Sequence, residues 1–384
     1  MLKKNKVAVS VFFIAFATGL NITGISPILG VVNEKYQQYG TSVVQLLHTL
    51  PYLLLMLGSL IVGWWTTKTS KKKILSLGLL IIGFCGILPF FSDSFYLLFL
   101  SRLLIGFGFG ISSPLNAAVI TDLVEEENRA GYMGLHVVGM GIGTMIGNLA
   151  GGMLSGFGYH FFYLVYMIAF ISWIAVQFLL PETLPAASEK ADEMKLNAVV
   201  YGLSAASFAH TLFINAYSTN IGIYLIQNIT KDTTVTGIVT AVNAIFALLM
   251  GAFFAKISGI LKRYTVAVSV FAAAAGYGAL LFIPGMIGVY LASACCGISL
   301  SCFMAGCSMQ ISVSVEPEAV AKANGIFSVV GSIGGLIAPV FMGNAASVVF
   351  GENTAMNQFH VACIGMFVLG VIMALAVSRR RWSK

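Results

Sequence analysis

Charged residues are scarce in this chain of 384 residues. Aspartate, glutamate, lysine and arginine together make up 9% of it, whereas a soluble domain carries roughly 25%. Hydrophobic residues reach 58%, and runs of about 20 apolar residues, long enough to cross a bilayer as helices, recur along the whole length. The composition excludes an ordinary soluble domain. It predicts an all-α membrane protein, because the runs are continuously apolar rather than alternating as in barrel strands.

Motifs that carry enzyme or pump chemistry are also lacking. The sequence contains no P-loop, no HExxH and no Ser–His motif, so neither an enzyme nor an ATP-driven pump within this chain is indicated. The six cysteines all fall in apolar runs and have no zinc-like spacing with histidine. We therefore expect no metal site, no cofactor and no disulfide framework.

The apolar runs divide into twelve predicted membrane spans. We place them at 7–31, 44–66, 74–92, 95–121, 131–156, 159–181, 198–226, 234–257, 264–284, 286–313, 322–348 and 358–378. The first span is too long, and too well followed by others, to be a cleaved signal peptide. With an even number of spans, both termini lie on the same side of the membrane.

Lysine and arginine predict which side that is. Of the 21 basic residues, 18 lie at the termini or in loops on the side of the termini. Only Lys35 and Lys231 lie in the opposite loops, and Arg102 lies within a span. The positive-inside rule makes the basic side cytoplasmic. The net charge of +7 then reflects topology and contact with anionic lipid rather than nucleic-acid binding, and we expect a monomeric, multi-pass protein of the cell membrane.

A register of 191 residues relates the two halves of the chain. It joins Gly106 to Gly297, Gly134 to Gly325, Gly143 to Gly334, Gly152 to Gly343, and Lys71–Lys72 to Lys262–Arg263. The longest polar stretch, with Pro181 and Pro185, lies midway and breaks helix continuity. We predict two similar six-helix bundles, at 1–181 and 198–384, joined by a cytoplasmic linker at 182–197. Many secondary transporters are built in this way and bind substrate between the bundles near the bilayer midplane.

The loop between spans 2 and 3 resembles the signature loop of the major facilitator superfamily. That signature is a glycine, then an acidic–basic pair, then a basic cluster, and this chain keeps Gly63, Lys68 and Lys71–Lys73 (Lys71, Lys72 and Lys73). Thr67 stands where the family usually has an aspartate that supports a charge network in the outward-open form, so the resemblance does not extend to that network. The alternative interpretation is that these lysines serve only positive-inside topology.

Two further segments resemble motifs of the same family. In span 4, Arg102 precedes a glycine-rich helix, and in the drug:proton antiporter branch that arginine is associated with proton coupling. Span 5 carries a stripe of small residues on one helical face, of the kind that lets two helices approach closely, with Asn148 where the antiporter motif has proline. The stripe consists of Gly139, Gly143, Gly147, Gly151 and Gly152. In the second half the residue in register with Asn148 is Pro339.

Arg102 is the one basic residue within a span. It lies roughly 10 Å below the outer end of span 4 at 1.5 Å per residue. An unpaired arginine in lipid costs at least ~2.5 kcal/mol, so it should face the central cavity or bond to carbonyls of a neighbouring helix. We interpret it as an anchor for an anion or carboxylate, or as a gate for proton movement. The alternative is a structural arginine tied to backbone oxygens. Its partner in the register is the uncharged Ser293.

The resemblance implies that spans 1, 4, 7 and 10 line the cavity. Side chains on these spans that could hydrogen-bond a substrate are Asn21, Asn116, Asn215, Tyr217 and Gln310. Each could equally bond a neighbouring helix. His210, near the middle of span 7, could carry a coupling proton because histidine titrates between pH 5 and 8. A hydrogen-bonded packing role is the alternative for His210.

These observations favour a secondary transporter over other classes. None of the fourteen acidic residues lies in the middle of a span, which argues against an exporter of lipophilic cations. The leading hypothesis is a transporter driven by the proton gradient that exports a small neutral or anionic organic compound by alternating access. Proton-coupled uptake of a nutrient such as an organic acid is the second interpretation. A membrane sensor that has lost transport would explain Thr67 and Asn148, but not the polar residues on the four cavity-lining spans.

Overall fold

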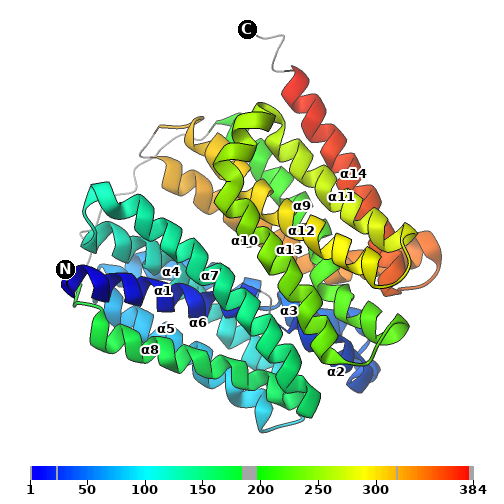
Figure 1. The fold of residues 1–384 in the computed structure, drawn as a ribbon, viewed down its shortest axis with the longest axis horizontal. Helices are drawn as coiled ribbons and strands as arrows, with labels where there is room; N and C mark the ends of the chain where they lie inside the picture. Colours follow the sequence, from blue (N-terminus) through cyan, green and yellow to red (C-terminus); the bar gives the residue numbers. More distant parts are fainter. Residues whose placement is uncertain (1, 23–24, 184–196, 317–318, 380–384) are drawn as a thin grey trace. The chain divides into compact units, whose positions relative to one another are not determined.

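The computed structural model describes residues 2–22, 25–183, 197–316 and 319–379 (Figure 1). Most of the predicted linker at 182–197 lies outside the described residues. The helices of the first half are α1 (Leu2–Ile22), α2 (Leu29–Lys35), α3 (Thr41–Thr49), α4 (Pro51–Thr66), α5 (Lys71–Ile87), α6 (Phe95–Leu123), α7 (Glu126–Leu154) and α8 (Ile168–Leu179). Those of the second half are α9 (Ala198–Asn228), α10 (Thr233–Leu261), α11 (Thr265–Phe282), α12 (Gly285–Ser312), α13 (Val320–Phe350) and α14 (Ala355–Arg379).

These helices confirm the predicted all-α membrane architecture, and no strand occurs in the part of the chain that the structure describes. Ten helical runs are long and apolar enough to cross a membrane. One of them, Thr233–Phe282, comprises α10 and α11 with the 3-10 helix η6 (Lys262–Tyr264) between them. A shorter apolar stretch, Asn5–Leu20, lies within α1. With these counted separately, every one of the twelve predicted spans falls on helix.

Several helix starts follow from capping side chains. The Ser70 hydroxyl accepts a hydrogen bond from the Lys73 backbone N–H, so α5 begins at Lys71, three residues before the predicted span. Ser94 caps α6 in the same way. The Asn197 side chain accepts from the backbone N–H groups of Val199 and Val200, the second and third residues of α9. These caps satisfy donors that have no partner within the helix.

Several predicted spans are not single α-helices. The first is divided among α1, the 3-10 helix η1 (Ser26–Ile28) and α2. The second is divided between α3 and α4, with Pro51 opening α4 at a position where a missing N–H does no harm. The sixth begins as the 3-10 helix η5 (Tyr159–Met167) before α8.

The helices form two compact units. Unit 1 comprises Met1–Val32, Leu47–Lys190 and Asp232–Ala241, and unit 2 comprises Asn33–Leu46, Ala191–Lys231 and Val242–Lys384. Each unit thus includes a short segment from the other half of the sequence. These two segments obey the 191-residue register, because Thr41 at the start of α3 is in register with Asp232, which directly precedes α10.

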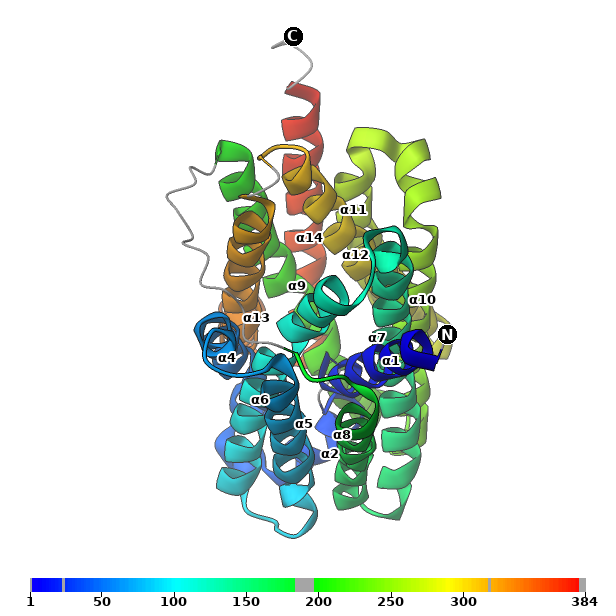
Figure 2. The same cartoon turned by 90° about the vertical axis from the view of Figure 1, so that its left-hand side faces the viewer.

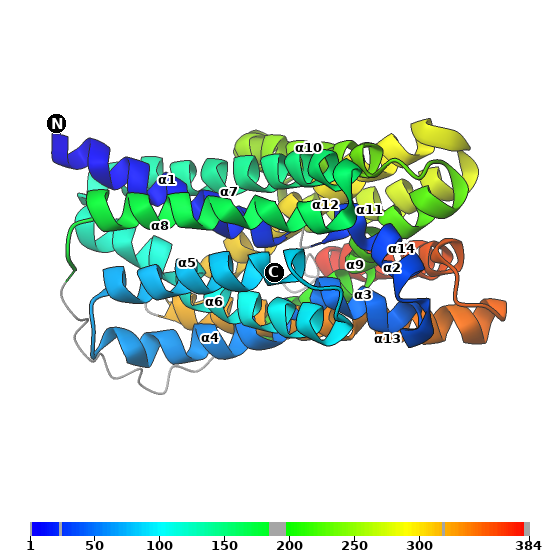
Figure 3. The same cartoon turned by 90° about the horizontal axis from the view of Figure 1, so that it is seen from below.

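Within unit 1, α1 runs along α7 and α8 (Figure 3), and α4 and α5 pack on α6 (Figure 2). Its buried core contains Ile14 of α1, Leu75 of α5, Val119 of α6 and Val176 of α8. Within unit 2, α9 packs along α13 and α14, and α11 packs on α12 and α14. Long exposed apolar stretches on the outward faces of the helices, such as those around Phe178 and Phe282, suit contact with lipid.

Candidate functional site

Arg102 is fully buried in unit 1, on α6. Its Nε donates to the Leu47 carbonyl oxygen at 3.1 Å, and its Nη1 donates to the Tyr166 hydroxyl oxygen at 2.6 Å. The Leu47 carbonyl is available because the residue four positions later is Pro51, which has no N–H to donate. The Nη2 of Arg102 has no hydrogen-bond partner. The guanidinium is therefore held by a backbone oxygen, as one of the two predictions required, and keeps one donor group free for a further acceptor.

Asn116 lies farther along α6, about 21 Å from Arg102 at 1.5 Å per residue. Its Nδ2 donates to the Val11 carbonyl oxygen of α1 at 3.1 Å and lies 2.6 Å from Nδ1 of His136 on α7. Its Oδ1 is buried without a partner. Asn116 thus connects three helices and retains one free acceptor.

His210 is fully buried in unit 2, on α9. Its Nε2 lies 3.0 Å from the Ser299 hydroxyl of α12, and its ring stacks on Phe303 with centroids 3.9 Å apart and planes 2° apart. Its Nδ1 has no partner. The ring is fixed in place by stacking, and one of its two nitrogens has no hydrogen-bond partner.

Tyr217 of α9 contacts Ser293, the residue in register with Arg102. Its hydroxyl donates to Ser293 Oγ at 2.7 Å, and Ser293 Oγ in turn donates to the Val289 carbonyl. A buried charge in unit 1 therefore corresponds to a neutral pair of hydroxyl groups in unit 2. The two positions in register are thus both buried but differ in charge.

A tyrosine of α11 contacts the backbone of α9 just before Tyr217. The Tyr277 hydroxyl of α11 accepts a hydrogen bond from the Tyr217 backbone N–H at 3.1 Å and donates to the Phe213 carbonyl at 2.8 Å. In an undistorted helix these two backbone groups bond to each other. A side chain inserted at this point is a recognised cause of helix bending.

The other predicted substrate contacts differ in their surroundings. Asn215 of α9 donates to the Thr211 carbonyl of its own helix at 2.7 Å, and Gln310 lies half-buried on α12. The side chain of Asn21 lies outside the described residues. Among the described side chains, no hydrogen bond joins two of the predicted substrate-binding residues. Arg102 and Asn116 belong to unit 1, whereas Asn215, Tyr217 and Gln310 belong to unit 2.

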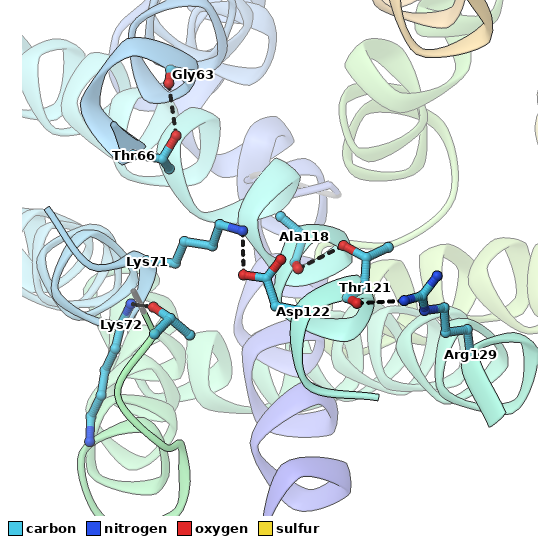
Figure 4. Close-up of polar contacts among 9 residues, drawn as sticks. Gly63, Thr66, Lys71, Lys72, Ala118, Thr121, Asp122 and Arg129 are labelled. Atoms are coloured by element: carbon cyan, nitrogen blue, oxygen red, sulfur yellow. Dashed lines mark hydrogen bonds and ion pairs between the residues drawn. The ribbon is translucent and has the colours of Figure 1, made fainter. Parts of the chain in front are cut away.

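The basic loop between α4 and α5 contains an ion pair (Figure 4). Lys71 Nζ pairs with the Asp122 carboxylate near the end of α6. Lys72 Nζ donates to the Gln177 carbonyl at 2.9 Å, and Lys68 lies over the Trp64 ring at 4.0 Å. Lys73 is exposed, and Gly63 has open space where a Cβ would be. Three of the four predicted lysines therefore make specific contacts.

Thr67 and Arg129 complete the description of this region. The Thr67 hydroxyl, at the position of the usual aspartate, donates to the Trp64 carbonyl of its own turn at 2.8 Å. Arg129 of α7 donates to the carbonyls of Thr121 and Val124 at 2.9 and 3.1 Å, which caps the end of α6 (Figure 4). The altered position thus makes a local contact only, and positive charge is brought to the end of α6 by Lys71 and Arg129 instead.

The glycines of span 5 mark close helix contacts in unit 1. A Cβ on Gly143 would lie 2.1 Å from the Phe16 carbonyl oxygen of α1, and one on Gly152 would lie 2.7 Å from Gly237 Cα of α10. Contacts of 2.9 Å or less would also arise at the rest of the stripe, Gly139, Gly147 and Gly151. Only glycine allows these helices to pack at this distance.

The same contacts recur 191 residues later in unit 2. A Cβ on Gly334 would lie 2.3 Å from the Phe208 carbonyl oxygen of α9. This matches the contact that a Cβ on Gly143 would make with a carbonyl oxygen of α1. A Cβ on Gly343 would lie 2.3 Å from the Ser42 hydroxyl of α3. Gly134 and Gly325, also in register, both face open space. The duplication is therefore present in the packing as well as in the sequence.

Asn148 departs from this symmetry. It is buried on α7, and neither its Nδ2 nor its Oδ1 has a partner. Its register partner, Pro339, lies inside α13. Asn148 therefore adds an unpaired polar group to unit 1, where the second half has an apolar residue without a backbone donor.

Sequence reasoning did not single out several residues that the structure shows in polar contacts. Tyr166 and Tyr277 hold Arg102 and α9, and Gln45 and Gln358 form a buried amide network in unit 2. Pro51 was the one available signal, since a proline in a span leaves the carbonyl four residues earlier without its usual donor. The others are long-range contacts that no spacing along the sequence encodes.

Long apolar helices, duplicated glycine contacts and isolated polar groups within the helices define a multi-pass membrane protein of the transporter class, rather than an enzyme. Residues 11–339 and 203–382 match the model of the Major Facilitator Superfamily. The chain belongs to this superfamily, and its membership supports a secondary transporter.

Curated relatives match part of the chain. It is 29% identical over 123 residues to "Multidrug resistance protein 2" of Bacillus subtilis (strain 168), which covers 32% of this chain and 31% of the relative. It is 25% identical over 154 residues to "Sphingosine-1-phosphate transporter SPNS2" of Danio rerio, covering 39% of this chain and 31% of the relative. The matches span about a third of the length of these two relatives.

Solved transporter structures share the fold along nearly the whole chain. A bacterial homolog of the human lysosomal transporter Spinster, inward-facing and unoccupied, matches with a TM-score of 0.77 and 16% identity over 98% of this chain and 97% of that chain. The nucleoside transporter NupG matches with a TM-score of 0.78 and 14% identity over 98% of this chain and 100% of that chain. At these identities the likeness shows the fold alone.

Proposed function

We propose that this protein exports a small neutral or anionic organic solute across the cell membrane by alternating access, driven by protons, in the manner of the antiporter branch of its superfamily. In this proposal both termini are cytoplasmic, a single chain suffices for transport, and the two predicted six-helix bundles move about the solute. The observation that carries the proposal is the buried Arg102 with its free Nη2.

The charge of Arg102 favours an anionic group as its partner. Among the described residues no carboxylate is ion-paired with Arg102, whose contacts are a backbone carbonyl and a tyrosine hydroxyl. A buried guanidinium without a counter-charge is costly, and a carboxylate or phosphate on the solute would offset that cost. The name of one relative, the sphingosine-1-phosphate transporter, also refers to an anionic solute.

His210 is the candidate for proton coupling. It is buried on α9 with Nδ1 free, in a protein whose acidic residues lie outside the middle of the predicted spans. A histidine at this position can alternate between neutral and charged forms as solute and proton exchange. The drug:proton antiporter resemblance and the name of the Bacillus relative support export as the direction.

The proposal is tested with purified protein in liposomes, an imposed pH gradient, and a panel of anionic, neutral and cationic solutes. We expect solute flux for anionic or neutral members and little for lipophilic cations. The Arg102→Ala variant should reduce flux of anionic solutes about tenfold to hundredfold, since a hydrogen bond to a charged group contributes roughly 1.5–3 kcal/mol.

The matched control is Lys256→Ala, which removes an exposed lysine outside the signature loop. It should leave flux unchanged. Anionic flux that is equal in the parent and in Arg102→Ala protein would overturn the assignment of Arg102. Preferred transport of cations would overturn the solute class.

A further inference from the structure

Three buried amide side chains form a closed hydrogen-bonded ring in unit 2. Gln45 Nε2 donates to Asn220 Oδ1 at 2.6 Å, Asn220 Nδ2 donates to Gln358 Oε1 at 2.7 Å, and Gln358 Nε2 donates to Gln45 Oε1 at 3.3 Å. All three residues are 0% exposed. They come from α3, α9 and α14, so the ring joins a helix of the first half of the sequence to two helices of the second half.

The ring extends to a second pair of side chains. Gln358 Nε2 also donates to Asn353 Oδ1 at 2.7 Å, and Asn353 Nδ2 donates to Ser42 Oγ at 3.1 Å. Gln45 Nε2 further approaches the Thr219 carbonyl oxygen at 3.5 Å. Five polar side chains therefore fix the start of α3 against α9 and α14.

The ring lies at the end of these helices that is remote from the basic loops. Asn220 lies about 33 Å along α9 from its start at 1.5 Å per residue. Gln358 lies in the first turn of α14, whose last residue is Arg379, and Gln45 lies near the start of α3. In the predicted topology this is the outer end of the helices.

Comparison of α3 with α10, its counterpart in the 191-residue register, shows that a helix start can pack without an amide ring. The residue in register with Gln45 is Thr236 of α10, which is buried with its hydroxyl unpartnered. The start of α10 packs in unit 1 through Gly237 against Gly152, with Thr233 Oγ1 donating to the Gly152 carbonyl at 3.3 Å. The amide ring therefore has no counterpart at the register-related start of α10.

Two features of α3 and α9 bear on how the amide ring could open. The residues of α3 before Leu47 belong to unit 2, while the helix continues into unit 1 from Leu47 onward. The Tyr277 hydroxyl of α11 bonds to the Phe213 carbonyl and the Tyr217 N–H of α9, and Tyr217 lies three residues before Asn220. The end of α9 that carries Asn220 thus adjoins a point where the helix can bend.

We propose that the ring of Gln45, Asn220 and Gln358 is an outer clasp that opens and closes once in each transport cycle. Amides suit this role because they are neutral, and water can replace each amide partner when the ring opens, at little net cost. This inference rests on the proposed transport function, since it assigns the clasp to the outer gate of alternating access.

Labelling of a buried cysteine tests the clasp without any solute. The Thr219→Cys variant, in a background whose six cysteines are replaced by serine or alanine, is placed in right-side-out vesicles and treated with a membrane-impermeant maleimide. Thr219 is 1% exposed beside the ring, so labelling reports opening. The Gln45→Met substitution keeps side-chain length but removes the amide. It should raise the labelling rate about sevenfold, which is the loss of two interhelical hydrogen bonds at about 0.6 kcal/mol each.

Two further variants keep the test decisive. Gln358→Met removes the amide from α14 and should raise the rate to a similar degree, which covers a failure of Gln45→Met to fold. Thr236→Val, at the register-related position, removes an unpartnered hydroxyl and should leave the rate unchanged. Equal rates in the parent and in both methionine variants, including no labelling of any, would overturn the clasp.

The outcome is separable from that of the proposed function. Faster labelling in both methionine variants supports the clasp even if no solute of the panel is transported. Equal labelling together with measured transport would leave the transporter intact and remove the clasp.

Discussion

At the level of single residues, the chemistry depends on how a few polar groups are partly satisfied within apolar helices. Arg102 uses a carbonyl that Pro51 leaves free and the hydroxyl of Tyr166, and so two of its three nitrogens are paired. The remaining Nη2 is buried without a partner. The sequence predicted that Arg102 faces the central cavity or bonds to carbonyls of a neighbouring helix, but neither Leu47 nor Tyr166 could be named, because tertiary contacts decide them.

Substitution of His210 is the sharpest single-residue test of the proton-coupling proposal. In His210→Gln protein the side chain can still hydrogen-bond Ser299 but cannot carry a proton. We expect solute exchange between equal pools to persist, while accumulation driven by a pH gradient falls at least tenfold and the dependence of exchange on pH between 5 and 8 flattens. Both rates are measured in the same liposome preparation.

His360→Gln is the matched control for this variant. His360 is half-buried on α14 and bonds only locally, with Nδ1 3.0 Å from the Met356 carbonyl oxygen, so its loss should leave the pH profile unchanged. Gradient-driven accumulation at the parent rate in His210→Gln protein would assign His210 to packing against Phe303 instead.

At the level of helices, the glycine spacing predicted where helices approach each other but not which helix is the partner. Gly143 meets α1 and Gly152 meets α10, and the sequence contains no signal for either pairing. The basic loop shows a similar limit. Lys71 lies at the start of α5 and Asp122 at the end of α6, each at the unfavourable pole of its own helix dipole. Their pairing resolves both conflicts, and only the fold brings them together.

Alanine substitutions distinguish the packed glycines from the open ones. Gly143→Ala and Gly334→Ala place a methyl group against a backbone carbonyl of the neighbouring helix, and overpacking of this kind costs about 1–3 kcal/mol. Each should lower the Tm of the detergent-solubilised protein by several degrees. Gly134→Ala and Gly325→Ala face open space and should leave the Tm unchanged or raise it slightly, because alanine favours helix by up to about 1 kcal/mol over glycine.

The thermal shift of all four variants is measured by the same method. A loss of stability at Gly134 or Gly325 equal to that at Gly143 and Gly334 would show that the close contacts do not explain the glycine stripe. Similar losses at Gly143 and Gly334 would instead establish that the two register-related contacts are energetically equivalent.

At the level of the whole molecule, the two halves share their packing and differ in their polar groups. The spans, the glycine contacts and the exchanged helix starts all follow the 191-residue register, so the fold was largely predictable from duplication and hydropathy. The differences are Arg102 against Ser293, Asn148 against Pro339 and Gln45 against Thr236. Side-chain partners at these positions were not predictable, because a register relates positions along the chain and says nothing of what each side chain reaches.

These asymmetric positions are the ones to which we assign solute binding and gating. In the proposed mechanism two similar bundles move against each other, while the single-copy polar groups bind the solute and set the direction of transport. The central claim is that solute movement through this scaffold is coupled to protons in the opposite direction.

Proton movement on addition of solute tests this claim most directly. Purified protein is reconstituted in liposomes that contain a pH-sensitive dye, a transported anionic or neutral solute is added to one side, and internal pH and solute are followed together. The account predicts that solute entry moves protons outward in fixed proportion, and that His210→Gln abolishes the proton signal while solute exchange continues. Solute movement with no change of internal pH in the parent protein would contradict it.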